Sequence, residues 1–554
     1  MEELIFGVIG GTALLMYGVG MMGDGLEKVS GNTMKKIVTV LTGKVWSAFL
    51  VGILLTALIQ SSTAMTVLTV GFVNSGLMNL SQAVGIIYGA NIGTTVTAQL
   101  MAFSFKFKLT DIALPILGLG FAINHISKNG KLRNIGQALM GFGLMFLGLR
   151  ILNDGIPYMQ QSEALRHFFA TYTSVPIFGI LLGAFATAMV HSSAATVGLV
   201  MILSQAGLLD LNSAIYLILG DNIGTCITAQ LASMSGNINA RRTALAHTFY
   251  NVFGVVLALA AFPQFLKVIN IATVYIQPKA DISAYIANAH TLFNTLNALV
   301  FLPLTEHYVK FLNTVVKSKA DIDTDKIYLD RLLLDTPVAA LRAARSEIIR
   351  GAEIVKSMLK DAIELLHTGD TAKLAAIQDS EVTVNAMQRE LTEYIVEISK
   401  RELTASQSLM VPATVSSINN IERIGDRTIE ICRLYDSKVD RGLKFSEYAL
   451  RELRELEVVI VELLDNVMIA LNGKDDAVID RIVELEDRVD YLSETFQKNH
   501  IERLNQGNCI IDSGVIYIDM IGSLERIADH AYKIGMFTKD ELFGKKCKTP
   551  YHKD

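Results

Sequence analysis

Long apolar runs separated by short polar breaks make up the first part of the chain. Four such stretches precede residue 130, at residues 4–23, 45–76, 81–103 and 110–126. The second is unusual, because the polar residues from Gln60 to Thr63 divide it into halves of about 15 residues, whereas a membrane span needs about 20. Two short halves that meet at polar residues predict a re-entrant helical hairpin, which enters the membrane and turns back.

The same pattern recurs later in the chain. Residues 60–100 align without a gap to residues 191–231, with 18 identities in 41 positions, and residues 11–25 match 141–155. The predicted number of membrane crossings before residue 136 is odd, so the second copy begins on the opposite side of the membrane. We therefore expect two inverted repeats, at about 5–134 and 135–315.

The basic residues of this part fall mostly in alternate loops, which indicates an orientation. Because lysine and arginine concentrate in cytoplasmic loops, the N-terminus is predicted outside a plasma (inner) membrane and the C-terminal part in the cytoplasm. Lys106 and Lys108 are exceptions to the rule. The residues that follow it are Lys28, Lys35, Lys36, Lys44, Lys128, Lys131, Arg133, Arg241, Arg242, Lys310, Lys317 and Lys319.

The charge changes near residue 320. Residues 1–319 hold 11 acidic and 18 basic side chains, and the remainder holds 43 and 31. Beyond this point, amphipathic patterns predict six long helices, at 333–367, 371–403, 406–436, 445–472, 476–506 and 509–537. The predicted fold is all-α: a polytopic membrane domain (1–315), a linker (316–332), a soluble bundle of two three-helix units (333–540) and a tail (541–554).

Other classes of protein fit the sequence less well. The four cysteines follow no metal-ligand spacing and are expected to be reduced. The chain has neither a P-loop nor an evident pairing of a nucleophile with a base, so we expect no enzyme and no ATP-driven pump. No nucleic-acid partner is predicted.

The polar breaks suit ion binding. Backbone N–H groups and serine hydroxyls at a half-helix N-terminus attract an anion, and the G-A-N-I-G-T-T and G-D-N-I-G-T-C segments offer oxygen atoms suited to sodium. The alternative is that these serines and threonines only pack between helices. Asp221 is an ionisable residue inside a predicted span, and it either neutralises a cation or stabilises the break.

These motifs resemble a known family. Q-S-S-T and H-S-S-A, each followed by G-x-N-I-G-T, are similar to the paired Q-S-S-S and G-x-N-I-G-T motifs of type II sodium-dependent phosphate cotransporters, as are A-H-T-F-Y-N (246–251) and A-H-T-L-F-N (289–294). The resemblance implies a central site for phosphate and sodium. The second tip departs from the family pattern at His191, where the family has glutamine, and at Ala194, where it has serine. His191 either binds phosphate, titrates with pH or has a structural role. The phosphate ligands that the resemblance implies are Gln60, Ser61, Ser62, Thr63, Asn91, Ser192, Ser193 and Asn222, and His191 is a further candidate at the place of the family's glutamine. The sodium ligands are Thr94, Thr95, Thr225, Gln60, Ser62 and Ser193.

The acidic part resembles the PhoU domain of phosphate signalling. It carries E-x-x-x-D twice, as Glu422/Asp426 and Glu525/Asp529. This spacing stacks two carboxylates on one helix face, where they bind a metal or lie in solvent. The resemblance implies a regulatory domain with a divalent or transition metal, and loss of that metal when Glu422 and Asp426 are both replaced.

Together with these patterns, the two resemblances imply a sodium-coupled secondary transporter of inorganic phosphate in the lipid bilayer, with a cytoplasmic regulatory domain. Two alternatives are a membrane-anchored phosphate sensor and a transporter of another small oxyanion, such as sulfate or arsenate. A homodimer and a cytoplasmic regulatory partner are compatible with the sequence, which leaves both open.

Overall fold

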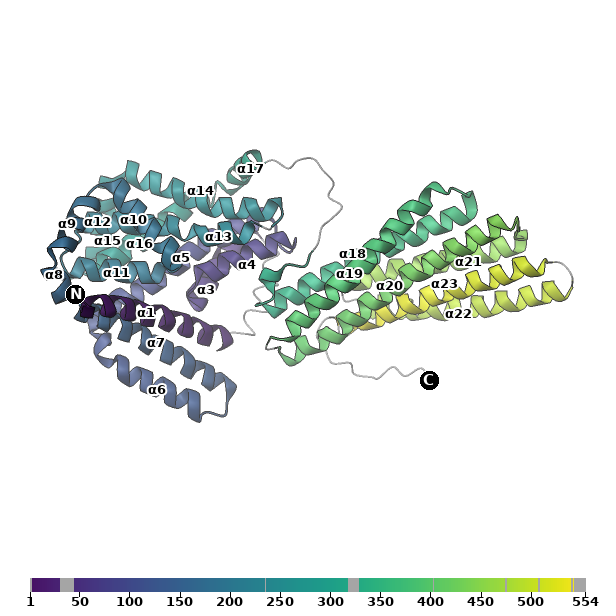
Figure 1. The fold of residues 1–554 in the computed structure, drawn as a ribbon, viewed down its shortest axis with the longest axis horizontal. Coiled ribbons are helices and arrows are strands. Elements are labelled where there is room, and N and C mark those ends of the chain that lie inside the picture. The colour runs from purple at the N-terminus through teal and green to yellow at the C-terminus, as the bar shows by residue number, and fades with distance from the viewer. Residues whose placement is uncertain are drawn as a thin grey trace. The chain divides into compact units, whose positions relative to one another are not determined.

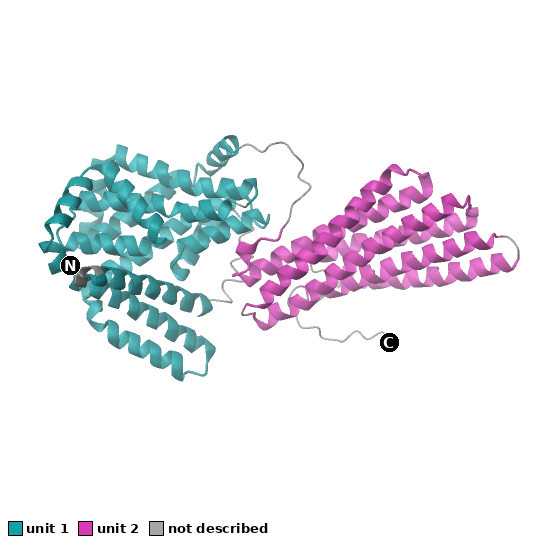
Figure 2. Ribbon diagram, viewed as in Figure 1, with its two compact units in different colours: residues 1–325 teal, residues 326–554 magenta. Residues whose placement is uncertain are grey.

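The computed structural model describes residues 2–29, 44–234, 236–316, 328–401, 403–473, 476–506, 509–539 and Leu542. Lys35, Lys36, Lys317, Lys319 and most of the predicted linker and tail lie outside these residues. The chain forms two compact units, Met1–Asp325 and Lys326–Asp554 (Figure 2). Throughout the described ranges the regular structure is helical, without strands, which confirms the all-α prediction.

The first unit is built from helices (Figure 1). Its main helices are α1 (Glu2–Val29), α3 (Val45–Ile59), α4 (Ser62–Asn74), α5 (Leu80–Phe107), α6 (Ala113–Ile126), α7 (Gly130–Asp154), α8 (Ile156–Gln161), α9 (Glu163–Tyr172), α10 (Pro176–Val190), α11 (Ser193–Gln205), α12 (Leu211–Gly224), α13 (Cys226–Ser233), α14 (Ile238–Ala260), α15 (Phe262–Ile276), α16 (Ile282–Phe301) and α17 (Thr305–Val315). Within the described residues, 4 helical segments are long and apolar enough to cross a membrane, or up to 5 if the bent pair α9–α10 counts as one. The unit therefore has the composition of a multi-pass membrane domain.

Helices α1 and α7, the first helices of the two sequence repeats, pack against each other through glycines. A Cβ atom on Gly18 would lie 2.7 Å from the carbonyl oxygen of Gly141, and one on Gly148 would lie 2.6 Å from that of Gly11. An early residue of α1 thus meets a late residue of α7, so the two helices run antiparallel. Gly18 and Gly148 are equivalent positions of the two repeats at the offset of 130, and so are Gly11 and Gly141. Exchanging the repeats therefore turns one glycine contact into the other, as a two-fold axis requires, and this agrees with inverted repeats.

The polar break at Gln60 is the tip of a hairpin. A Cβ on Gly85 would lie 2.8 Å from the carbonyl oxygen of Val45, and one on Gly93 would lie 2.8 Å from that of Ile53. These contacts advance in step, so α3 and α5 run parallel, and α4 between them must run back. Because α3 has 15 residues, it is about 22 Å long, less than the roughly 30 Å of the hydrocarbon core.

The second copy repeats this packing. A Cβ on Gly220 would lie 2.0 Å from the carbonyl oxygen of Ile180, and one on Gly224 would lie 2.4 Å from that of Ala184. Helices α10 and α12 are therefore parallel, and α11 returns between them. The outgoing helices of the two hairpins have the same length of 15 residues, and the return helices α4 and α11 both have 13.

The second unit contains the six predicted helices, as two three-helix units. They are α18 (Pro337–Thr368), α19 (Ala372–Ser399) and α20 (Ala405–Asp440), then α21 (Glu447–Asn472), α22 (Asp476–Asn505) and α23 (Ile511–Lys539). Helices α18, α19 and α20 pack on one another, as do α21, α22 and α23, and α20 packs on α23. Their apolar faces form a core that is buried within the unit.

Candidate functional site

The two hairpin tips have the same backbone conformation. Gln60 (φ 59°, ψ 23°) and His191 (φ 55°, ψ 25°) are both left-handed, and the only other described non-glycine residue with positive φ is Lys108. A side chain in this conformation costs about 1 kcal/mol. The conformation turns the chain sharply, so that one helix ends and the next begins within two residues.

Each return helix begins with a serine cap. The Ser61 hydroxyl accepts a hydrogen bond from the Ala64 amide (3.1 Å), and the Ser192 hydroxyl accepts one from the Ala195 amide (3.3 Å). Neither α4 nor α11 has an acidic side chain in its first turn. The first N–H groups of a helix have no acceptor inside the helix and carry its positive dipole end. Both tips therefore present donors and partial positive charge.

The side chains at the two tips differ. The Gln60 amide oxygen accepts a hydrogen bond from the Thr97 hydroxyl on α5, and its nitrogen donates to the Ala57 carbonyl. One amide N–H of Gln60 is left for another acceptor. His191 occupies the same place in the second tip with its side chain exposed.

Substitution of Gln60 separates the role of its backbone from that of its amide. We expect Gln60→Gly and Gln60→Ala to weaken phosphate binding to a similar degree, because both lack the amide. The glycine variant should be the more stable by about 1 kcal/mol, because only alanine keeps the cost of the left-handed conformation. Isothermal titration calorimetry and thermal unfolding of the purified protein measure both effects. Phosphate affinity equal to that of the unmodified protein in both variants would exclude Gln60 as a ligand.

The predicted sodium ligands of the two N-I-G-T segments bond to their own helices. Thr94 donates to the Ala90 carbonyl (3.0 Å), Thr95 to that of Ile92 (2.7 Å) and Thr225 to that of Asn222 (2.8 Å). These bonds use the hydroxyl protons and leave oxygen lone pairs free for a cation. The segments are not equivalent: α5 runs through the first without interruption, whereas the second is broken at Thr225, between α12 and α13.

The predicted phosphate ligands Asn91 and Asn222 are buried in these segments. The Asn91 amide nitrogen donates to the Ile87 carbonyl (3.0 Å) and the Asn222 nitrogen to the Ile218 carbonyl (2.8 Å). Both side chains lie one helical turn from their acceptor, in matching positions of the two repeats. Their orientation is thus set by the helix itself.

The return helices lie at the boundary between the repeats. Helix α4 packs on α13 and α14 of the second copy, and α11 packs on α5 and α1 of the first. The end of α4 is tied to the start of α14, because the Asn237 amide donates to the Asn74 side-chain oxygen (2.7 Å). The helices that carry the serine caps thus contact both repeats.

Two glutamines at equivalent positions of the repeats were not assigned from the sequence. The Gln99 amide donates to Thr291 (2.8 Å), and the Gln230 amide donates to Thr248 (2.7 Å). The two threonines belong to the A-H-T segments. Gln99 and Gln230 are identical in the alignment of the two repeats, and this identity is the feature of the sequence that could have marked them as candidate site residues.

The predicted metal site of the second unit is not assembled. Burial raises the pKa of Glu422, and the Asp426 and Glu381 carboxylates add to this effect. Arg423 lies 3.5 Å from Glu422, and Lys533 lies 2.7 Å from Asp529. In the described part of the chain, no group of three or more His, Cys, Asp and Glu side chains is placed to hold a metal ion. The residues as arranged do not fit a metal centre, so the metal prediction is unsupported.

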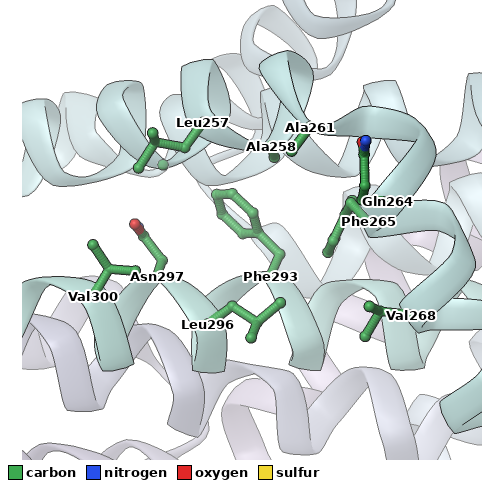
Figure 3. Close-up of a pocket in the computed structure, with 11 residues that line it drawn as sticks. Leu257, Ala258, Ala261, Gln264, Phe265, Val268, Phe293, Leu296, Asn297 and Val300 are labelled. Atoms are coloured by element: carbon green, nitrogen blue, oxygen red, sulfur yellow. The ribbon is translucent and has the colours of Figure 1, made fainter.

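A separate cavity of about 260 Å³ lies between α14, α15 and α16 (Figure 3). Leucine, valine, alanine and phenylalanine side chains line most of it, and Gln264 and Asn297 are its polar members. A phosphate ion would lose its hydration there with little compensation. None of the predicted phosphate or sodium ligands lines this cavity, so it is distinct from the tips.

Comparison with known proteins identifies both parts of the chain. The Na+/Pi-cotransporter family matches residues 14–154 and 155–277, and the PhoU domain matches residues 348–434 and 453–538. The "Putative inorganic phosphate export protein YjbB" of Salmonella typhimurium is 27% identical over 530 residues, which cover 94% of each chain.

Two further relatives each match one part. The "Uncharacterized protein YqeW" of Bacillus subtilis is 30% identical over 316 residues, which cover 56% of this chain and 98% of YqeW. The "Phosphate-specific transport system accessory protein PhoU homolog 1" of Thermotoga maritima is 24% identical over 192 residues, which cover 34% of this chain and 82% of the homolog. Both resemblances read from the motifs are confirmed, and the chain belongs to the Na+/Pi-cotransporter family, with PhoU domains following its membrane domain.

Proposed function

We propose that the protein carries inorganic phosphate across the membrane together with sodium, by alternating access. The observation that carries this proposal is the pair of matched hairpin tips, each a left-handed residue followed by a serine-capped helix. Helix N-termini bind anions, and transporters with inverted repeats place such sites near the midplane of the bilayer. The name of the Salmonella relative indicates phosphate export for that protein; for this chain we propose that the ion gradients set the direction.

We propose the following ligands. Phosphate binds Gln60, Ser61, Ser62, Thr63, Asn91, His191, Ser192, Ser193 and Asn222. Sodium binds Thr94, Thr95 and Thr225, with Gln60, Ser62 and Ser193 at the boundary between the two ions. The proposed domains are the membrane domain (1–315), in two inverted repeats, and a cytoplasmic regulatory domain (333–540).

The charge balance of the site supports sodium coupling. The aligned segments 60–100 and 191–231 contain no arginine. A bidentate arginine would hold phosphate strongly, whereas a carried ion must be released. Sodium then supplies the positive charge that phosphate needs, and it leaves when the phosphate leaves.

Flux measurements test the proposal. In proteoliposomes that contain the purified protein, an imposed sodium gradient should drive uptake of radiolabelled phosphate. Ser62→Ala and Ser193→Ala should each weaken phosphate binding about tenfold or more, because a hydrogen bond to a charged group is worth about 1.5–3 kcal/mol. Ser174→Ala, at an exposed position between α9 and α10, is the control and should leave the flux unchanged.

The alternatives give different results in the same assay. Phosphate binding without flux would identify a sensor. Flux of labelled sulfate or arsenate in preference to phosphate would identify a transporter of another oxyanion. Unchanged flux in both serine variants would contradict the proposed site.

A further inference from the structure

Asp221 is an ionisable side chain that lies on α12, in the second N-I-G-T segment, and is 0% exposed. One of its carboxylate oxygens accepts a hydrogen bond from the Thr187 hydroxyl (2.7 Å). The other oxygen has no hydrogen-bond partner among the described residues. A buried carboxylate therefore has one oxygen available for a ligand.

Two hydroxyl groups accompany this carboxylate. Thr187, at the end of α10, has its hydroxyl oxygen 2.9 Å from that of Thr196 on α11. The Thr187 carbonyl also accepts the backbone N–H of His191 (2.8 Å), which places the group one turn from the second tip. Helices α10, α11 and α12 thus each contribute one oxygen-bearing side chain to one buried point.

An uncompensated charge at this point would be costly. Removing a carboxylate from water costs several kcal/mol unless a cation or a proton joins it. Within the described ranges, no lysine, arginine or histidine forms a salt bridge with Asp221. Carboxylate and hydroxyl oxygens are ligands that suit a hard cation, and sodium is the cation of the proposed cotransport.

The first repeat lacks this arrangement. At the repeat offset of 131, Ala90 stands in place of Asp221 and Met65 in place of Thr196. Thr56, the equivalent of Thr187, is buried, and its hydroxyl has no partner among the described residues. Only the second tip therefore has a carboxylate next to it, and the two repeats differ chemically at the position of Asp221 and Ala90.

We propose that Asp221, with the hydroxyls of Thr187 and Thr196, binds one sodium ion directly behind the second hairpin tip. The bound ion neutralises the carboxylate and links α10, α11 and α12. It also removes a negative charge from beside the helix end that is proposed to hold phosphate. This inference rests on the proposed function, and it assigns one of the coupling ions to a specific site.

The test measures sodium rather than phosphate alone. We expect binding of radiolabelled sodium to the purified protein, without phosphate, to weaken at least tenfold in Asp221→Asn. In proteoliposomes this variant should also move one sodium fewer per phosphate. Asparagine keeps an oxygen that can accept from Thr187, so folding should be preserved. Thr196→Val should weaken sodium binding less, by severalfold, without changing any formal charge.

The matched control is Asp210→Asn. Asp210 caps α12 by accepting a hydrogen bond from the Ser213 amide (2.9 Å), and asparagine caps a helix equally well. This variant removes one negative charge from the same helix, and its sodium affinity and stoichiometry should match those of the unmodified protein.

The outcomes separate this inference from the proposed function. If the unmodified protein shows no sodium-driven phosphate flux, the proposed function fails. If that flux is present but Asp221→Asn keeps its sodium affinity and stoichiometry, only the sodium site fails. Loss of a proton-driven component in Asp221→Asn, with sodium binding intact, would assign the carboxylate to a proton and overturn the inference.

Discussion

Replacing Gly220 with valine should lower sodium-driven phosphate flux at least tenfold. A Cβ atom at this position would lie 2.0 Å from the Ile180 carbonyl oxygen and 2.9 Å from the Ala184 amide nitrogen. These are backbone atoms of α10, so no change of rotamer relieves the overlap, and the two helices must separate. Overpacking of a core costs about 1–3 kcal/mol when side chains can adjust, and here they cannot. The separation would move α12 away from the second tip.

The control for this experiment is Gly118→Val. Gly118 is an exposed residue of α6, and a Cβ atom there meets nothing within 4 Å. Gly89→Val, at the matching position of the first repeat, should behave like Gly220→Val, because its Cβ would lie 2.1 Å from the Phe49 carbonyl oxygen. Flux is compared per amount of monodisperse protein in size-exclusion chromatography. Normal flux in Gly220→Val would refute the close packing of α10 and α12.

Replacing Arg503 with methionine should destabilise the second three-helix unit of the PhoU-like part by about 3 kcal/mol. Arg503 on α22 forms a bidentate pair with Glu452 on α21, at 2.9 and 2.6 Å. Their side chains are only 17% and 13% exposed. Tyr517 on α23 also donates to Glu452. Without Arg503, a largely buried carboxylate loses its only cationic partner among the described residues.

Hydrogen exchange of the full-length protein measures this effect. Amides of α21 to α23 should exchange about a hundredfold faster in Arg503→Met, since each 1.4 kcal/mol corresponds to about a factor of ten. Arg488→Met is the matched control, because the Arg488–Glu455 pair joins the same two helices at 3.1 Å with about half of each side chain exposed. Exposed pairs contribute roughly 1 kcal/mol or less. Equal exchange in the two variants would show that burial does not strengthen the Arg503 pair.

Acid should reduce the difference between the unmodified protein and Arg503→Met. Burial disfavours the charge on Glu452, but hydrogen bonds from Arg503, Tyr517 and Asn499 outweigh it and lower the pKa of this carboxyl below its usual 4.5. A lowered folded-state pKa gives stability that is present above pH 4.5 and is lost as the pH falls through the folded value. The advantage of the unmodified protein in hydrogen exchange should therefore shrink below pH 4.5.

The sequence predicted the elements better than their contacts. Polar interruptions at Gln60 and His191 located both hairpin tips, because a break in an apolar run is local information. The hydrogen bond between Gln60 and Thr97 spans 37 residues, and it depends on how closely α3 and α5 approach. That approach is set by glycines such as Gly85 and Gly93, whose partners cannot be read from the sequence.

At the predicted metal site, the helix face was predicted correctly but the contacts with neighbouring helices were not. The i, i+4 spacing placed Glu422 and Asp426 on one helix face, as expected. A metal centre also requires ligands from neighbouring helices at short range, and in the described residues that grouping is missing. The sequence alone marks Asp221 as an ionisable residue in a predicted span. Its partner Thr187, 34 residues earlier, emerged only from the packing of α10 on α12.

The placement of the hairpin arms has a mechanical consequence. The outgoing arms α3 and α10 lie along helices of their own repeat, while the return arms α4 and α11 are also held by the opposite repeat. The two arms of each hairpin are thus held by different repeats. We therefore expect any shift of one repeat against the other to change the angle between the arms of each hairpin at Gln60 and His191. The residues nearest the proposed anion are then also the ones at which the backbone must bend.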